Sequence, residues 1–148
     1  MVMRLMPTVL GAALLVTAAC GVKAGGLPEI EVDRTACSHC GMLISEPLYA
    51  AAYQAPGAAA RVFDDIGCLR AAARAEAPGL RFWFHDADDR RWIEGAGAVF
   101  VASSEIRTPM GGGLIAYRDP AAAARSAVRH HGRIIRSMSD LLITKGGA

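Results

Sequence analysis

Apolar and polar residues follow two regular spacings along the chain, and these spacings predict short strands and two helices. Alternation with a period of two is typical of half-buried strands, whereas a spacing of three to four residues indicates a helix. Tyr49, Ala51 and Tyr53 alternate with their neighbours, as do Leu80 and Phe82. Strands are expected at residues 49–54, 61–63, 80–85, 92–93, 98–102, 114–117 and 133–135.

The first predicted helix follows the strand at residues 61–63. Ile66, Leu69 and Ala73 recur at helical spacing, Asp64 and Asp65 offer an N-cap, and Pro78-Gly79 stops the helix. These signals are local, and they place the helix between two strands.

A second helix repeats the same arrangement about 54 residues later. Asp119 is the expected N-cap, Pro120 occupies the first helical position, residues 121–131 form the helix, and Gly132 ends it. A strand precedes and follows each helix. The sequence therefore predicts an α+β fold with an internal duplication, its pseudo-repeats at about 29–92 and 93–148.

The N-terminus has the pattern of an export signal. Residues 1–19 carry one basic residue, Arg4, then an apolar run and small residues before Cys20. This resembles a bacterial lipobox with Thr17 in the position where leucine is usual, and it predicts that Cys20 is acylated; the alternative is ordinary cleavage nearby. Residues 20–28 would then form a lipid-anchored tether on the periplasmic face of a membrane. Gly21, which is not the aspartate that retains many lipoproteins in the inner membrane, favours the outer membrane.

Length and charge exclude some classes of protein. A chain of 148 residues favours one domain, here residues 29–148. The formal net charge is only +2 and basic residues form no stripe, so we expect no nucleic-acid partner. With Cys20 acylated, three cysteines remain, and an odd number cannot pair fully within one chain. In an oxidising compartment this favours metal or redox chemistry.

The segment Cys37-Ser38-His39-Cys40-Gly41-Met42 is the main candidate for that chemistry. The two-residue spacing of Cys37 and Cys40 allows one turn of backbone to chelate one ion. Met42 adds a thioether and His39 an imidazole. Thiolate and thioether together are soft ligands that favour copper(I). The segment therefore predicts a copper(I) site.

Two other interpretations of Cys37 and Cys40 stay open. A zinc site would need further ligands from Cys68 or His130-His131, which lack the paired spacing of a zinc knuckle. A periplasmic thiol-disulfide oxidoreductase would use the two cysteines as a redox pair, although Gly41 and a non-helical flank depart from that pattern. The pair would otherwise be a structural staple.

Other residues of interest have ordinary structural interpretations. Cys68 is interpreted as a small buried residue of the first helix, and Asp64-Asp65 as its cap. His85-Asp86 is interpreted as a turn with a hydrogen-bonded histidine, and His130-His131 as a favourable charge at a helix end. Met110, in a loop with Pro109 and three glycines, is a core residue or a distant ligand that folding must bring to the site.

Taken together, several motifs of the chain resemble the NosL family. The resemblance extends from about Cys37 to Leu142. The motifs are Cys37-Ser38-His39-Cys40-Gly41-Met42, Phe63-Asp64-Asp65-Ile66-Gly67-Cys68, Phe84-His85-Asp86, Trp92 and Thr108-Pro109-Met110-Gly111.

The family consists of lipid-anchored copper chaperones that serve the maturation of nitrous oxide reductase. The resemblance implies two related ββαβ units and copper(I) held by Cys37, Cys40, Met42 and Met110, with His39 as the preferred histidine. It implies binding and delivery rather than catalysis. The expected partners are the apo nitrous oxide reductase and the membrane transporter assembly of the same pathway.

Overall fold

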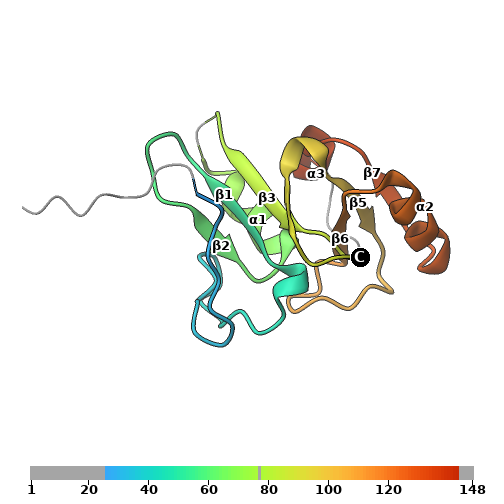
Figure 1. The fold of residues 1–148 in the computed structure, drawn as a ribbon, viewed down its shortest axis with the longest axis horizontal. Coiled ribbons are helices and arrows are strands. Elements are labelled where there is room, and N and C mark those ends of the chain that lie inside the picture. The colour runs from blue at the N-terminus through green and yellow to red at the C-terminus, as the bar shows by residue number, and fades with distance from the viewer. Residues whose placement is uncertain (1–25, 77, 144–148) are drawn as a thin grey trace, which may run out of the picture.

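The computed structural model describes residues 26–76 and 78–143 of the chain (Figure 1). The predicted signal peptide, Cys20 and the tether up to residue 25 lie outside this part. The described residues form two antiparallel sheets with a few short helices, so the predicted α+β class is confirmed. None of the described helices combines the length and the apolarity that a membrane span requires.

The first unit is a four-stranded antiparallel sheet with one helix. After a 3₁₀ turn, η1, the sheet has the strand order β2-β1-β3-β4. The helix α1 lies between β2 and β3 in the chain and packs against β1 and β2. The elements are η1 (Pro47–Tyr49), β1 (Ala51–Gln54), β2 (Arg61–Phe63), α1 (Ile66–Ala73), β3 (Arg81–His85) and β4 (Trp92–Glu94).

The second unit repeats this topology. Its three strands have the order β6-β5-β7, which corresponds to β2-β1-β3, and its helix again precedes the third strand. Both units therefore contain a ββαβ motif, to which the first unit adds β4. The predicted division at residues 92 and 93 falls inside β4. The elements are η2 (Gly95–Gly97), β5 (Val99–Ala102), β6 (Leu114–Tyr117), α2 (Pro120–Arg129), β7 (Arg133–Ile135) and α3 (Met138–Ile143).

Equivalent aspartates begin the two long helices. The Asp65 side chain accepts a hydrogen bond from Gly67 N, and the Asp119 side chain accepts from Ala121 N and Ala122 N. Each carboxylate satisfies backbone donors that have no partner within the helix. The first helix ends at Ala73, before the predicted stop. No sequence pattern had predicted α3.

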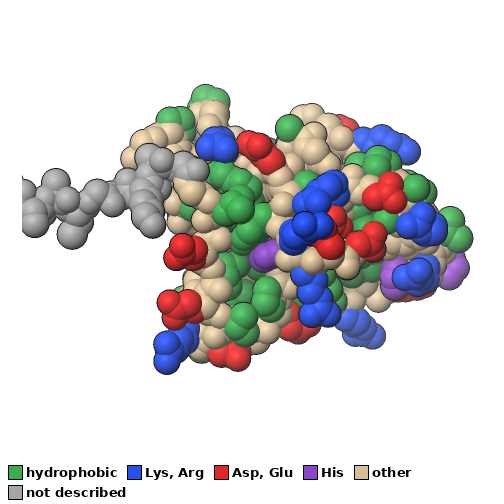
Figure 2. Space-filling model, viewed as in Figure 1, with side chains coloured by type: hydrophobic (Ala, Val, Ile, Leu, Met, Phe, Trp, Pro, Cys, Tyr) green, Lys and Arg blue, Asp and Glu red, His purple; other side chains and the backbone are tan. Residues whose placement is uncertain are grey.

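One hydrophobic core joins the two sheets. The rings of Phe84 on β3 and Phe100 on β5 meet edge to face with their centroids 4.8 Å apart. A smaller apolar cluster lies under α2. The shared core contains Cys37 and Cys68. On the face in Figure 2, apolar side chains gather over the first sheet, while acidic and basic side chains intermingle over the second.

Candidate metal centre

The segment from Cys37 to Met42 folds into a tight turn against the first sheet. Cys37 N donates to Met42 O at 2.8 Å, and Gly41 N donates to Cys37 O at 2.9 Å. Gly41 has a φ of +78°, in the left-handed region that glycine adopts without strain. Ser38 N donates to Val62 O at 2.8 Å, which fixes the turn on β2.

The end of β2 and the start of α1 bring two further side chains to this turn. Asp64 follows the last residue of β2, and Cys68 lies in the first turn of α1. Asp64 precedes the N-cap Asp65, whose extended backbone turns the two neighbouring carboxylates to opposite sides of the chain. Asp64 and Cys68 are 2% and 5% exposed.

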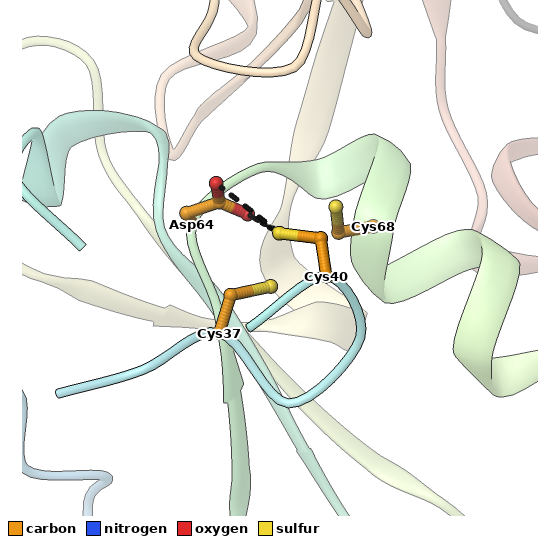
Figure 3. A group of neighbouring side chains, drawn as sticks. All are labelled: Cys37, Cys40, Asp64 and Cys68. Carbon is orange, nitrogen blue, oxygen red and sulfur yellow. Dashed lines mark hydrogen bonds between the residues drawn. The ribbon is translucent and has the colours of Figure 1, made fainter. Parts of the chain in front are cut away.

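These elements assemble Cys37, Cys40, Asp64 and Cys68 into one cluster (Figure 3). The candidate ligand atoms, three sulfurs and a carboxylate oxygen, all lie within 4.8 Å of one another. Cys40 Sγ is 3.8 Å from each oxygen of Asp64 and donates to that carboxylate. Cys37 is only 3% exposed, whereas Cys40 is partly open to solvent. All three cysteines are free thiols.

The surroundings favour the protonated form of the two buried thiols. Burial raises the pKa of Cys37, although backbone N–H groups of Cys40 and Asp64 partly oppose that rise. Burial also raises the pKa of Cys68, and the nearby Cys37 and Asp64 raise it further. Thiolates in this space would repel one another and the carboxylate. A bound cation would therefore replace protons and neutralise converging negative charge.

The other predicted ligands lie outside this cluster. His39 is exposed and does not join it among the described residues. Met42 and Met110 are 52% and 44% exposed, which is unusual for methionines that serve only to fill a core. Their ligand roles, and that of His39, stay predictions.

A network of hydrogen bonds holds the loop that carries Met110 beside the start of α1. The acceptor is the fully buried Asp65, whose Oδ2 accepts from Thr108 Oγ1, from Met110 N at 3.3 Å and from Gly112 N at 3.4 Å. Asp65 is the immediate neighbour of Asp64. Folding thus places the thiol cluster beside Asp64 and the loop that carries Met110 beside Asp65, its neighbour in the chain.

Sequence reasoning missed two members of the cluster. Cys68 is buried in the core as expected, but it also faces the other thiols, so its interpretation as a mere core residue was incomplete. The sequence pattern indicates a helix cap at Asp64-Asp65, yet only Asp65 caps the helix. The spacing of four residues between Asp64 and Cys68, at the entry to a helix, was the available signal.

The histidines away from the turn have local roles. The ring of His85 stacks on Trp92 with centroids 3.8 Å apart, and burial lowers the pKa of this imidazole. Asp86 accepts a hydrogen bond from Asp88 N at 3.1 Å, as expected for a turn, but His85 itself ends β3 and its buried Nδ1 has no hydrogen-bond partner among the described residues. His131 Nδ1 lies 3.0 Å from Glu105 Oε1.

Comparisons with known proteins identify a family and a similar solved structure. The model of the NosL family matches residues 29–141. The fold is similar to the crystal structure of the copper chaperone NosL from Shewanella denitrificans, with a TM-score of 0.64 and 17% sequence identity. That similarity covers 77% of this chain and 97% of the other. No curated protein matches the sequence.

Proposed function

The chain belongs to the NosL family, and from that premise and the geometry of the thiol cluster we propose that it binds copper(I) and passes it to a partner protein. The similar crystal structure is that of a copper chaperone, which supports this proposal. The proposed role is binding and transfer, without catalytic turnover.

The observation that carries the proposal is the convergence of three sulfurs and one carboxylate within 4.8 Å. Copper(I) favours soft sulfur ligands and accepts two or three thiolates. Cys37, Cys40 and Cys68 supply such a set in a largely apolar environment. Asp64 adds an oxygen that accepts from Cys40 in the metal-free protein.

Unequal exposure of the ligands favours transfer over permanent storage. Cys37 and Cys68 are buried, but Cys40 is partly exposed. The exposed thioethers of Met42 and Met110 are proposed as outer ligands that meet copper as it arrives or leaves. His39 is a further candidate on the same turn. A partner ligand would then displace the protein's ligands one at a time, beginning at Cys40.

Family membership supports the biological setting of the proposal. The recipient would be apo nitrous oxide reductase, with the membrane transporter assembly of the same maturation pathway as second partner. The chain would be exported, acylated at Cys20 and held on the periplasmic face of a membrane, by preference the outer one. Coexpression with and without the chain tests this setting: unchanged copper content of the reductase would contradict it.

A competition assay with a coloured copper(I) chelator under anaerobic conditions tests the site. Cys40→Ser and Cys68→Ala should each weaken binding by more than about tenfold, because each removes a direct ligand. Cys20→Ser, which removes the cysteine outside the cluster, should leave the affinity unchanged. Binding as tight as wild type in a Cys37→Ser/Cys40→Ser double variant would refute the assignment.

The outer thioethers need their own control. Met42→Leu and Met110→Leu keep an apolar side chain of similar size but remove the sulfur, so they should speed copper release to a competing chelator. Met138→Leu makes the same change in α3, where the sulfur lies beside Gly95, and should not. Equal release rates for all three variants would remove the methionines from the proposed site.

A structural zinc site is the second candidate because Asp64 provides a buried oxygen donor. Three thiolates and one carboxylate can form a closed tetrahedral zinc site. Such a site would contribute directly to folding. Loss of the circular dichroism signal when a chelator removes the metal, with zinc in the purified protein, would favour this candidate over a copper carrier.

A further inference from the structure

The three thiols of the cluster differ sharply in their access to solvent. Cys37 and Cys68 are 3% and 5% exposed, whereas Cys40 is partly exposed. A disulfide or thiol from outside the protein must approach a sulfur closely in order to exchange with it. Cys40 is therefore the point at which such a molecule first meets the cluster.

The positions of the sulfurs allow a second exchange inside the protein. Cys37 and Cys40 Sγ atoms lie within 4.8 Å, and a disulfide needs a separation of about 2.05 Å. Both residues belong to one turn, which the hydrogen bond from Gly41 N to Cys37 O closes. Cys68 belongs to a different element, α1, whose first turn is held by Asp65. A bond between Cys37 and Cys40 therefore needs only one short turn to adjust, whereas a bond to Cys68 needs two separate elements to approach each other.

We propose that Cys40 of the metal-free protein is a site of thiol-disulfide exchange with small disulfides, and that Cys37 then closes an intramolecular disulfide with it. In the first step the sulfur of Cys40 attacks the small disulfide, which leaves a mixed disulfide and releases one thiol. In the second step the sulfur of Cys37 attacks the Cys40 sulfur and releases the second thiol. Two electrons and two protons pass from the cysteine pair to the two released thiols.

The exchange has a consequence for metal loading, and this part rests on the proposed function. The oxidised protein keeps only Cys68 as a free thiol of the cluster, so it should not take up copper(I). A dithiol reductant must act on Cys40 before loading, by the reverse of the same two steps. A bound ion would in turn block the exchange, because its ligands are the reacting sulfurs. The chain is thus a substrate of thiol-disulfide chemistry, not its catalyst.

Peptide mapping of the full-length, metal-free protein tests the proposal without any metal measurement. The probe is oxidised glutathione, followed by alkylation of the remaining thiols and digestion with trypsin. Cys37 and Cys40 fall in one tryptic peptide, residues 35–61, and Cys68 falls in the next, residues 62–70. The expected product is the first peptide two hydrogens lighter, with Cys68 alkylated. A dominant cross-link between the two peptides would overturn the assignment of Cys37.

Single variants separate the two steps. Cys37→Ser should stop the reaction at a stable glutathione adduct on Cys40, whereas Cys68→Ala should still form the disulfide. Cys40→Ser should react at least about tenfold more slowly at residues 35–61, and reaction at the wild-type rate would overturn the entry role of Cys40. Brief alkylation of the native wild type repeats this test without a mutation, since Cys40 should be labelled first. Copper(I) binding by the oxidised wild type is measured in a separate experiment. If the protein does not bind copper(I) at all, the proposed function fails, but the disulfide mapping still tests the exchange.

Discussion

The carboxylate of Asp65 joins the two units, and its removal should cost far more stability than the loss of a helix cap. Its equivalent in the second unit, Asp119, provides a matched control. Both aspartates cap a helix, but Asp119 is exposed and bonds only within its own helix. Asp65 is fully buried and also accepts hydrogen bonds from the loop at residues 108–113.

The contacts of the two aspartates indicate how far the losses in the free energy of unfolding should differ. Loss of a cap costs about 1 kcal/mol, which is the whole effect expected for Asp119→Ala. The ion pair of Asp119 with Arg125 is exposed at 3.8 Å and adds little. Asp65→Ala also removes the partner of the Thr108 hydroxyl and of backbone donors, and hydrogen bonds to charged groups contribute roughly 1.5–3 kcal/mol each. We expect a loss of about 3–5 kcal/mol for Asp65→Ala.

Urea denaturation followed by circular dichroism measures both losses on the same scale. The slope of the free energy of unfolding against urea should stay close to wild type, so that a shift in midpoint reports stability. Asp65→Asn keeps one acceptor oxygen but no charge, and it should fall between wild type and Asp65→Ala. If Asp65→Ala and Asp119→Ala lower the free energy of unfolding equally, within about 0.5 kcal/mol, the carboxylate does not hold the units together.

Three further changes have definite expected outcomes. Gly112→Ala places a methyl group against the Asp65 carboxylate and should cost about 1–3 kcal/mol in urea denaturation, whereas Gly26→Ala meets no neighbouring atom and should be neutral. Burial, together with a hydrogen bond to a carboxylate, raises the pKa of Tyr53 from 10.0 to about 12. The folded state therefore keeps this proton longer than the unfolded state, so stability present below pH 10 falls by roughly 2 kcal/mol as the pH rises to 12. Tyr53→Phe should remove that part of the decline, and a wild-type absorbance titration should show one phenol ionising near pH 12. Phe84→Ala should cost about 3–5 kcal/mol in the same urea assay, because it opens a cavity where the sheets meet.

The sequence predicted the two ββαβ units well because their signals are local. An aspartate cap, apolar residues at helical spacing and alternating strands each depend on a few neighbouring residues. α3 escaped prediction because six residues contain less than two turns of periodic pattern. The shared core could not be predicted from the sequence either, because nothing in the spacing of Phe84 or Phe100 indicates that their rings meet.

In the candidate site, too, residues close in the sequence were predicted and a residue joined to them by tertiary packing was not. Cys37 and Cys40 were found because one turn contains them both. Cys68 joins them only because α1 packs with its first turn beside that same turn, which depends on the sheet to which both are attached. The sequence therefore indicated the first two thiols of the cluster and missed the third.

The adjacent residues Asp64 and Asp65 show why sequence alone did not separate a member of the thiol cluster from a helix cap. Asp65 has extended backbone, with φ −149° and ψ 142°, and neighbouring side chains of an extended segment point to opposite sides. One carboxylate therefore faces the thiol cluster while the other holds the loop that carries Met110. If a bound ion draws Asp64 toward the cluster, it moves the residue next to Asp65, which holds that loop by hydrogen bonds. Under the proposed function, holding copper(I) at the thiols and presenting the Met110 thioether would both depend on these two aspartates.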